Sequence, residues 1–209
     1  MLLLSAISAC QSGPEKRIAS GPTTNEAEQA TVQPKGLPYD TAQLQQDSFG
    51  GHPILFYLRH PQIPQVAKDL YLGRAEPTDN DETLALMDSI FTKNTVTQPF
   101  YFLTLTRTMP KADGAYAEPL VIMAKEFAEQ QPKRFTTYFL AEKLLTVKDF
   151  NNWGECVAME FYTSNEGREV SARAAWAKAR LANCKKCSAA EKSKLREFTE
   201  LVSQWRPSS

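Results

Sequence analysis

The sequence has few of the residues that build metal centres or reactive sites. Of 209 residues only two are histidines, His52 and His60, and four are cysteines. No second CxxC accompanies the one at residues 184–187, so a structural zinc ion lacks its usual four ligands. No GxSxG, GxxxxGK[ST], HExxH or dinucleotide-binding glycine pattern is present. The sequence therefore predicts no metal, no cofactor and no enzymatic activity of a kind that leaves a local motif.

A net charge is also missing, because 24 Lys and Arg balance 24 Asp and Glu. From Arg173 to Arg206, however, nine basic residues face three glutamates, a local charge of +6. Such a surface suits anionic headgroups, a polyanion or an acidic protein, although an ordinary solvated helix face has the same composition. No aromatic residues alternate with the charges as in proteins that stack bases, so we expect no nucleic-acid partner. The candidate basic patch comprises Lys178, Arg180, Lys185, Lys186, Lys192, Lys194 and Arg196.

Long apolar stretches are absent, with one short exception at the start of the chain. No segment approaches the ~18–20 apolar residues of a transmembrane helix. Residues 1–10 form an apolar run that ends in small residues and Cys10. The last four, Ile7-Ser8-Ala9-Cys10, resemble the lipobox of bacterial lipoproteins. The resemblance implies a signal segment cleaved before Cys10, and a lipid on the cysteine sulfur that anchors the mature protein to a membrane.

The lipobox resemblance covers only these ten residues, and no Lys or Arg precedes the apolar run as in the usual pattern. It implies a lipid-anchored protein of the bacterial cell envelope, outside the cytoplasm. If the resemblance is accidental, the chain is cytoplasmic. Residues 11–48 are rich in Gln, Ser, Thr, Pro, Glu and Gly, which bury too little apolar surface to offset the entropy of ordering. We therefore expect a flexible polar tether over residues 11–48, followed by a folded domain over residues 49–209.

Within residues 49–209, apolar side chains recur at three- and four-residue intervals, the spacing of helices with one buried face. Capping boxes are predicted at Asp79–Glu82 and Ser188–Glu191, and Gly154 predicts the close approach of a neighbouring helix. The first apolar run also fits a short strand. Helices are expected at residues 53–58, 64–73, 79–91, 97–109, 119–130, 135–144, 147–163, 170–182 and 188–205. The predicted fold class is an all-α, single-domain antiparallel array of about seven to nine helices.

Three cysteines follow Cys10, and in an oxidising compartment two of them should pair. Cys156 could pair with Cys184 or Cys187, closing a loop of about 30 residues worth ~3 kcal/mol. Alternatively, Cys184 and Cys187 form a local bridge, and Cys156 is the free thiol. A functional alternative is a redox dithiol, because Lys185, Lys186 and a following helix start would lower a thiol pKa. The βαβ alternation that surrounds thioredoxin-type motifs is absent, however.

Acidic clusters are interpreted as ordinary surface. Asp79, Asp81 and Glu82 suit the start of a helix, where the helix dipole favours negative charge. Glu126 and Glu129 are expected on a solvated helix edge.

Together these features favour a non-catalytic, envelope-anchored lipoprotein that acts through protein–protein contact. One version is an immunity or inhibitor protein that neutralises an envelope-acting toxin; no residue identifies the partner. The alternatives are a thiol-dependent redox factor using Cys184 and Cys187, and a structural lipoprotein without a dedicated ligand.

Overall fold

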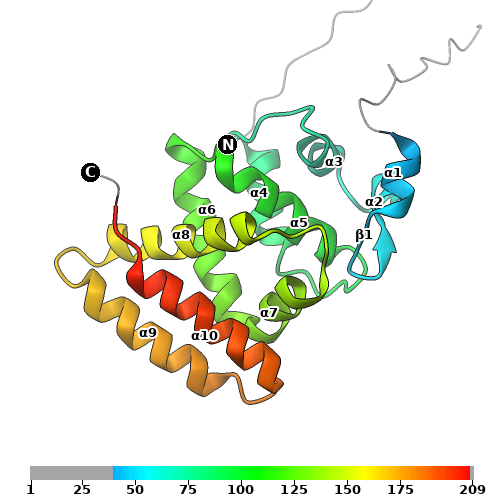
Figure 1. The fold of residues 1–209 in the computed structure, drawn as a ribbon. Helices are drawn as coiled ribbons and strands as arrows, with labels where there is room; N and C mark the ends of the chain where they lie inside the picture. The colour runs from blue at the N-terminus through cyan, green and yellow to red at the C-terminus, as the bar shows by residue number, and fades with distance from the viewer. Residues whose placement is uncertain (1–39, 208–209) are drawn as a thin grey trace, which may run out of the picture. The chain divides into compact units, whose positions relative to one another are not determined.

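The computed structural model describes residues 40–207 and places them in ten α-helices, one 3₁₀ helix and one short hairpin (Figure 1). The first elements are α1 (Thr41–Gln46), β1 (Ser48–Phe49), β2 (His52–Pro53), α2 (Ile54–Arg59), α3 (Gln65–Tyr71) and α4 (Asp81–Ser89). They are followed by α5 (Gln98–Thr108), η1 (Met109–Lys111), α6 (Gly114–Gln130), α7 (Pro132–Ala141), α8 (Val147–Ser164), α9 (Glu169–Asn183) and α10 (Ala189–Gln204). The predicted all-α, single-domain fold class is confirmed, and a helix is present at each of the nine predicted places.

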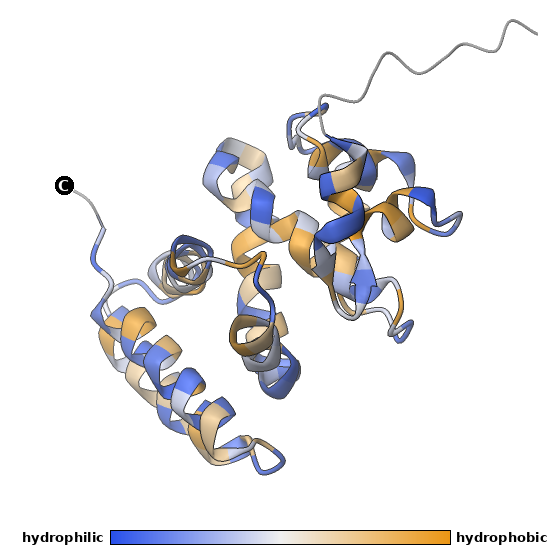
Figure 2. Cartoon of the chain, turned by 45° about the vertical axis from the view of Figure 1, so that its right-hand side comes forward, coloured by the Kyte–Doolittle hydropathy of each residue, from blue (hydrophilic) through white to orange (hydrophobic). Residues whose placement is uncertain are grey.

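Helix α5 lies at the centre of this array because it is buried on every side. Of its eleven residues only Arg107 is not buried. A helix without a solvated face needs neighbours all around it, and α5 contacts α3, α4 and α8. Figure 2 shows the contrast with the α9–α10 pair, in which hydrophobic and hydrophilic residues alternate along each helix.

One aromatic ring of α5 joins three further helices. The Phe102 ring centroid lies 5.3 Å from that of Phe127 in α6, 4.7 Å from that of Tyr138 in α7 and 4.9 Å from that of Trp153 in α8. The Trp153 indole N–H donates a hydrogen bond of 2.8 Å to Thr106 Oγ1, so its one polar group is satisfied. These rings make up the middle of the hydrophobic core.

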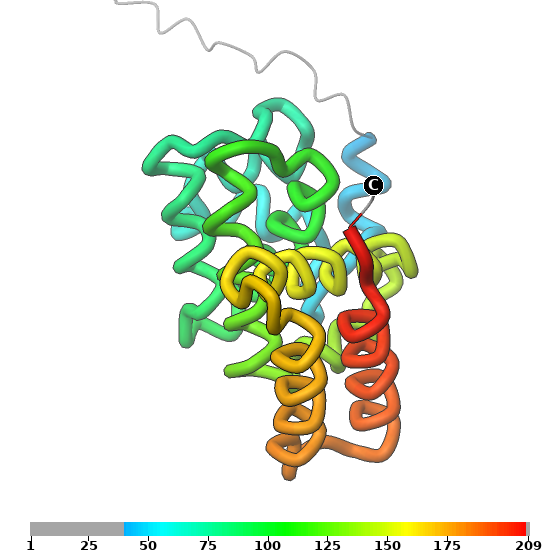
Figure 3. Tube along the Cα trace, turned by 90° about the vertical axis from the view of Figure 1, so that its left-hand side faces the viewer, coloured from blue at the N-terminus to red at the C-terminus, as the bar shows by residue number. Residues whose placement is uncertain are grey.

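Helices α9 and α10 lie side by side and antiparallel (Figures 1 and 3), and α10 also packs against α7 and α8. Phe198 of α10 inserts its ring between Phe135 of α7, at a centroid distance of 4.5 Å, and Phe150 of α8, at 5.4 Å. The C-terminal helix pair is therefore part of the same core as α5.

Gly154 of α8 allows α10 to approach closely, as the sequence predicts. A Cβ atom built at this position would lie 2.4 Å from Leu201 Cδ2 and 2.8 Å from Leu201 Cγ. Both distances are far below van der Waals contact, so only glycine fits between the two helices at this point.

Helical structure is present at an earlier position than predicted. Helix α1 lies inside residues 11–48, the segment predicted to be a flexible tether. The predicted end of the tether at residue 48 is therefore too late in the sequence. The Asp40 side chain caps α1 by accepting a hydrogen bond of 2.8 Å from the Ala42 amide, and Leu44 is buried in the core with 3% exposure. A helix this short with one buried residue has no periodicity to detect. The predicted part of the tether before residue 40 lies outside the described residues.

Two predicted helix starts also differ from the structure. Helix α6 begins at Gly114, before the predicted start at Pro119, and contains that proline. Tyr116 draws the extra turn into the core, where its hydroxyl lies 2.8 Å from Thr108 Oγ1. Helix α4 is capped by Asn80, whose side chain accepts a hydrogen bond of 2.9 Å from the Thr83 amide, and not by Asp79.

Buried tyrosines should make the fold sensitive to alkali. Burial raises the pKa of Tyr138 to about 12, and it also raises the pKa of Tyr57. In the unfolded chain both groups ionise near pH 10. Above that pH the unfolded state binds fewer protons than the folded state, so the free energy of unfolding falls as pH rises, by about 1.4 kcal/mol per pH unit for each tyrosine.

Urea denaturation between about pH 9 and pH 11 measures how steeply the free energy of unfolding falls as pH rises. Tyr138→Phe should flatten this slope, because phenylalanine has no ionisable group. The matched control is Tyr162→Phe, in which the substituted side chain is 48% exposed. A slope that Tyr162→Phe changes as much as Tyr138→Phe would contradict this account.

Candidate functional site

Cys184 and Cys187 form a disulfide in the connection between α9 and α10. Their Cα atoms are 5.4 Å apart, a normal separation for a disulfide. The structure thus contains the local bridge, one of the two predicted pairings. The other, a link from Cys156, is wrong, because Cys156 is free. Its helix face lies beside α6 and η1, where it lines a small cavity with Leu120 and Met109.

The free thiol of Cys156 is not prepared for nucleophilic chemistry. Burial, together with a smaller effect of the nearby Glu155 carboxylate, raises the pKa of Cys156 to about 12. The thiolate, not the thiol, is the reactive species. Cys156 is therefore protonated at neutral pH.

The disulfide is shielded by apolar side chains. Cys184 is 3% exposed and Cys187 8%, and both pack with Leu195 and Leu181. Thiol–disulfide exchange requires direct attack on a sulfur atom, so burial slows it. The position favours a structural staple over a redox dithiol. Closing so short a loop contributes about 2 kcal/mol in the chain-entropy model.

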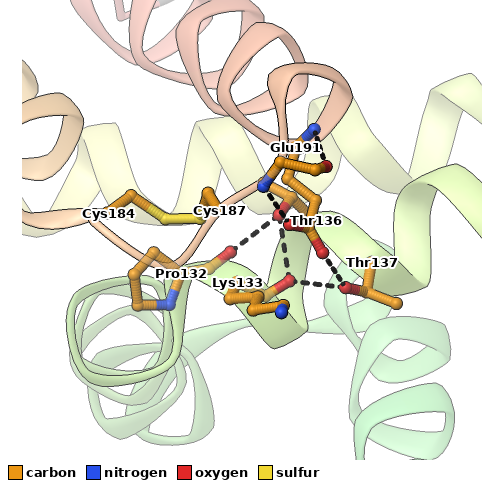
Figure 4. The surroundings of a disulfide bond; sticks show 8 residues. Pro132, Lys133, Thr136, Thr137, Cys184, Cys187 and Glu191 are labelled. Atoms are coloured by element: carbon orange, nitrogen blue, oxygen red, sulfur yellow. Dashed lines mark hydrogen bonds between the residues drawn. A yellow bond between two sulfur atoms is a disulfide. The ribbon is translucent and has the colours of Figure 1, made fainter.

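A capping box follows the disulfide and ties α10 to α7 (Figure 4). The predicted box is confirmed: Ser188 Oγ accepts a hydrogen bond of 3.2 Å from the Glu191 amide, and the Ser188 amide donates one of 2.6 Å to Glu191 Oε2. Glu191 Oε1 accepts a further bond of 2.8 Å from the Thr137 hydroxyl of α7. The hydrogen bond from the Ser188 amide is the main reason that the pKa of Glu191 is lowered. The start of α10 is therefore fixed against α7.

The seven residues predicted as a basic patch lie in different surroundings. Lys194 forms an ion pair of 2.7 Å with Glu197, and Arg180 Nη1 donates a hydrogen bond of 3.1 Å to the carbonyl oxygen of Glu129. Three more residues are exposed on α9 and α10, namely Lys178, Lys192 and Arg196. The remaining two, Lys185 and Lys186, line a cavity.

This cavity lies between α7 and the α9–α10 connection and has a volume of about 750 Å³. Four cationic side chains line it: Lys133 and Arg134 from the start of α7, and Lys185 and Lys186 beside the disulfide. No carboxylate is among its lining residues. We call it the cationic cavity. Figure 4 shows the disulfide near Pro132 and Lys133, and Cys184, Pro132 and Lys133 are all among the residues that line this cavity.

Lys133 and Arg134 could not be grouped with Lys185 from the sequence, because they are about fifty residues away from it along the chain. The sequence does contain a signal, since the Pro132-Lys133-Arg134 run places two cations at a helix start, where the dipole disfavours positive charge.

A second concave surface lies between α4 and α6. Its floor is apolar. Leu84 and Met87 come from α4 and Phe91 from the residues just after it, and α6 contributes Pro119, Ile122 and Met123. Its rim carries three carboxylates and no cation, the carboxylates being those of Asp81, Asp88 and Glu126. The volume is about 480 Å³. We call this surface the α4–α6 groove.

The acidic residues that the sequence predicts to be ordinary surface lie in different surroundings. Glu129 forms an ion pair of 3.2 Å with Lys125 and accepts a hydrogen bond of 2.8 Å from the Trp176 indole N–H. Glu126, by contrast, is exposed on the rim of the groove together with Asp81. Within residues 40–207, none of the three rim carboxylates forms an ion pair.

Neither a protein-family model, nor a curated protein, nor a solved structure matches this chain. In the part of the chain that the structure describes, no three His, Cys, Asp or Glu side chains are grouped to hold a metal ion. Among the same residues, no helix combines the length and hydrophobicity needed to cross a bilayer.

Proposed function

We propose that the chain is a non-catalytic, lipid-anchored protein of the bacterial cell envelope that binds another protein through the α4–α6 groove. The anchor is supported by the lipobox-like residues Ile7-Ser8-Ala9-Cys10, which lie outside the described residues. The binding role is supported by one observation, an apolar groove whose rim charges are all negative.

The partner that fits this groove is an apolar segment flanked by lysines or arginines. Ile122 leaves 47% of its surface exposed at the groove, and covering such a side chain is favourable by roughly 1 kcal/mol. The three rim carboxylates complement basic side chains on either side of the apolar contact, and such complementarity selects the partner and speeds association. A partner helix with one apolar stripe and basic flanks has this chemistry.

The anchor is tested by fatty-acid labelling of the protein in bacterial cells. The unchanged chain should take up label and fractionate with membranes. Cys10→Ala should lose both, because the sulfur that carries the lipid is gone. Membrane association that survives in Cys10→Ala would refute the anchor and leave the groove to be judged separately.

The groove is tested with a synthetic amphipathic peptide of leucine and lysine, and with the same peptide in which glutamate replaces each lysine. The lysine peptide should bind the purified chain and the glutamate peptide should not. Ile122→Ser should weaken binding about fivefold, since it removes roughly 1 kcal/mol of apolar contact. Equal affinity for the two peptides would overturn the proposal.

The matched control is Leu140→Ser on α7. Leu140 is 46% exposed, against 47% for Ile122, and does not line the groove. Its replacement should leave peptide affinity unchanged. If Leu140→Ser weakens binding as much as Ile122→Ser, the peptide is recognising general hydrophobicity and the groove has no special role.

A further inference from the structure

The cationic cavity concentrates positive charge that the rest of the structure leaves unpaired. Lys133, Lys185 and Lys186 are exposed, and in the described part of the chain neither they nor Arg134 forms an ion pair. Four like charges around one cavity repel one another, which costs free energy unless an anion enters. The cavity is on a different surface from the α4–α6 groove, so the inference is independent of the proposed function.

Arg134 is held in place by two glutamines. Its Nη1 donates to Gln131 Oε1 at 2.8 Å and also to Gln98 Oε1. Gln98 is fully buried at the start of α5 and donates a bond of 2.7 Å to the Ile90 carbonyl oxygen. The guanidinium is thereby oriented by the core, while its Nε and Nη2 donors carry no hydrogen bond to any residue between 40 and 207. A planar guanidinium with fixed orientation suits bidentate recognition of an oxyanion.

One acid close to the cavity, Glu191, is already engaged in hydrogen bonds. Glu191 lies close enough to Lys133 for that charge to lower its pKa, although hydrogen bonds from Ser188 and Thr137 lower it more. Those bonds hold both carboxylate oxygens within the capping box. Glu191 does not line the cavity, and when its charge is counted with the four cations the local sum is still +3.

Size and chemistry together indicate the ligand class. A cavity of about 750 Å³ has room for more than a single small ion, and pockets of this order hold small organic ligands. Three or more cations with one oriented guanidinium match a doubly charged phosphate better than a single carboxylate. We propose that the cationic cavity binds a phosphate group carried by a small molecule or by a lipid headgroup, with Arg134 and Lys133 on one wall and Lys185 and Lys186 on the other.

The test uses the full chain with Cys10→Ala, so that no acyl chain contributes to membrane binding. Glycerol 3-phosphate is titrated calorimetrically in one arm. In the other arm, vesicles of phosphatidylglycerol are compared with vesicles of phosphatidylcholine. Binding in the first arm alone identifies a soluble phosphate ester, and binding to phosphatidylglycerol vesicles identifies a headgroup; either result supports the cavity only if the variants below behave as expected.

Two double variants remove the same charge from neighbouring places. Lys185→Gln with Lys186→Gln removes two cavity cations, and Lys192→Gln with Arg196→Gln removes two exposed cations of α10 that do not line the cavity. The cavity double variant should weaken phosphate binding about tenfold or more, equivalent to roughly 1.4 kcal/mol, and the α10 double variant should change it little. All four side chains are exposed, so both variants should fold.

Two results would overturn the proposal. One is the absence of binding in both arms. The other is an equal loss in the two double variants, which would mean that general positive charge attracts phosphate without a site.

Discussion

Replacing Phe102 by alanine is expected to lower the free energy of unfolding by about 4 kcal/mol, since Phe→Ala changes in cores cost roughly 3–5 kcal/mol. The Phe102 side chain is fully buried, and its ring contacts aromatic rings in α6, α7 and α8. Removing it leaves a cavity where four helices meet, and close-packed walls relax into such a cavity only partly. Urea denaturation followed by circular dichroism measures the loss.

The control for this substitution is Phe56→Ala. Phe56 lies on α2 with 36% of its surface exposed and stacks on His52 at a centroid distance of 4.3 Å. Its removal creates no enclosed cavity, so the expected loss is about 1 kcal/mol or less. If both variants lose the same free energy, Phe102 is not the centre of the core.

Replacing Gly154 by valine is expected to cost about 3 kcal/mol, at the upper end of the usual cost of overpacking a core. Glycine and valine differ by only a few tenths of a kcal/mol in helix propensity, so the loss must come from steric conflict. The conflict is with Leu201 of α10, because a Cβ at position 154 would lie 2.4 Å from Leu201 Cδ2.

A double-mutant cycle isolates that conflict. Leu201→Ala removes the atoms that a new side chain at position 154 would meet. In this background, Gly154→Val should cost less than about 1 kcal/mol, because the two changes are complementary in volume. An undiminished cost in the Leu201→Ala background would show that the glycine is needed for the backbone of α8 and not for the approach of α10.

The long helices were predictable because each buries one face over several turns. Helix α8 shows this, since Phe150, Trp153, Val157 and Phe161 are all buried as their spacing predicts. Helix α1 has a single buried residue, Leu44. One contact in one turn leaves no period in the sequence, so its helical state follows from packing that only the folded chain provides.

The exact start of a helix is hard to predict where two adjacent residues could each cap it, because the sequence does not show which of them does. Asp79 and Asn80 are adjacent, and both are good N-cap residues. The structure uses Asn80. At Ser188 there was no competitor of this kind, and the predicted capping box with Glu191 is present.

The candidate sites were harder to predict because distant segments build them. Cys184 and Cys187 could be named as candidates from the sequence, but their pairing depended on how the turn after α9 places them. The cationic cavity needs Lys133 and Arg134 from another helix, and the α4–α6 groove needs Ile122 beside α4. No local pattern reports such juxtapositions, because they depend on tertiary packing.

The insertion of Phe198 between Phe135 and Phe150 has a consequence for any attempt to shorten the protein. Fragments that end after α8 would leave those two rings facing water, and a newly exposed aromatic surface promotes aggregation. The last helical hairpin is thus not a detachable accessory. Expression of this chain in a trimmed form should keep every residue through the end of α10.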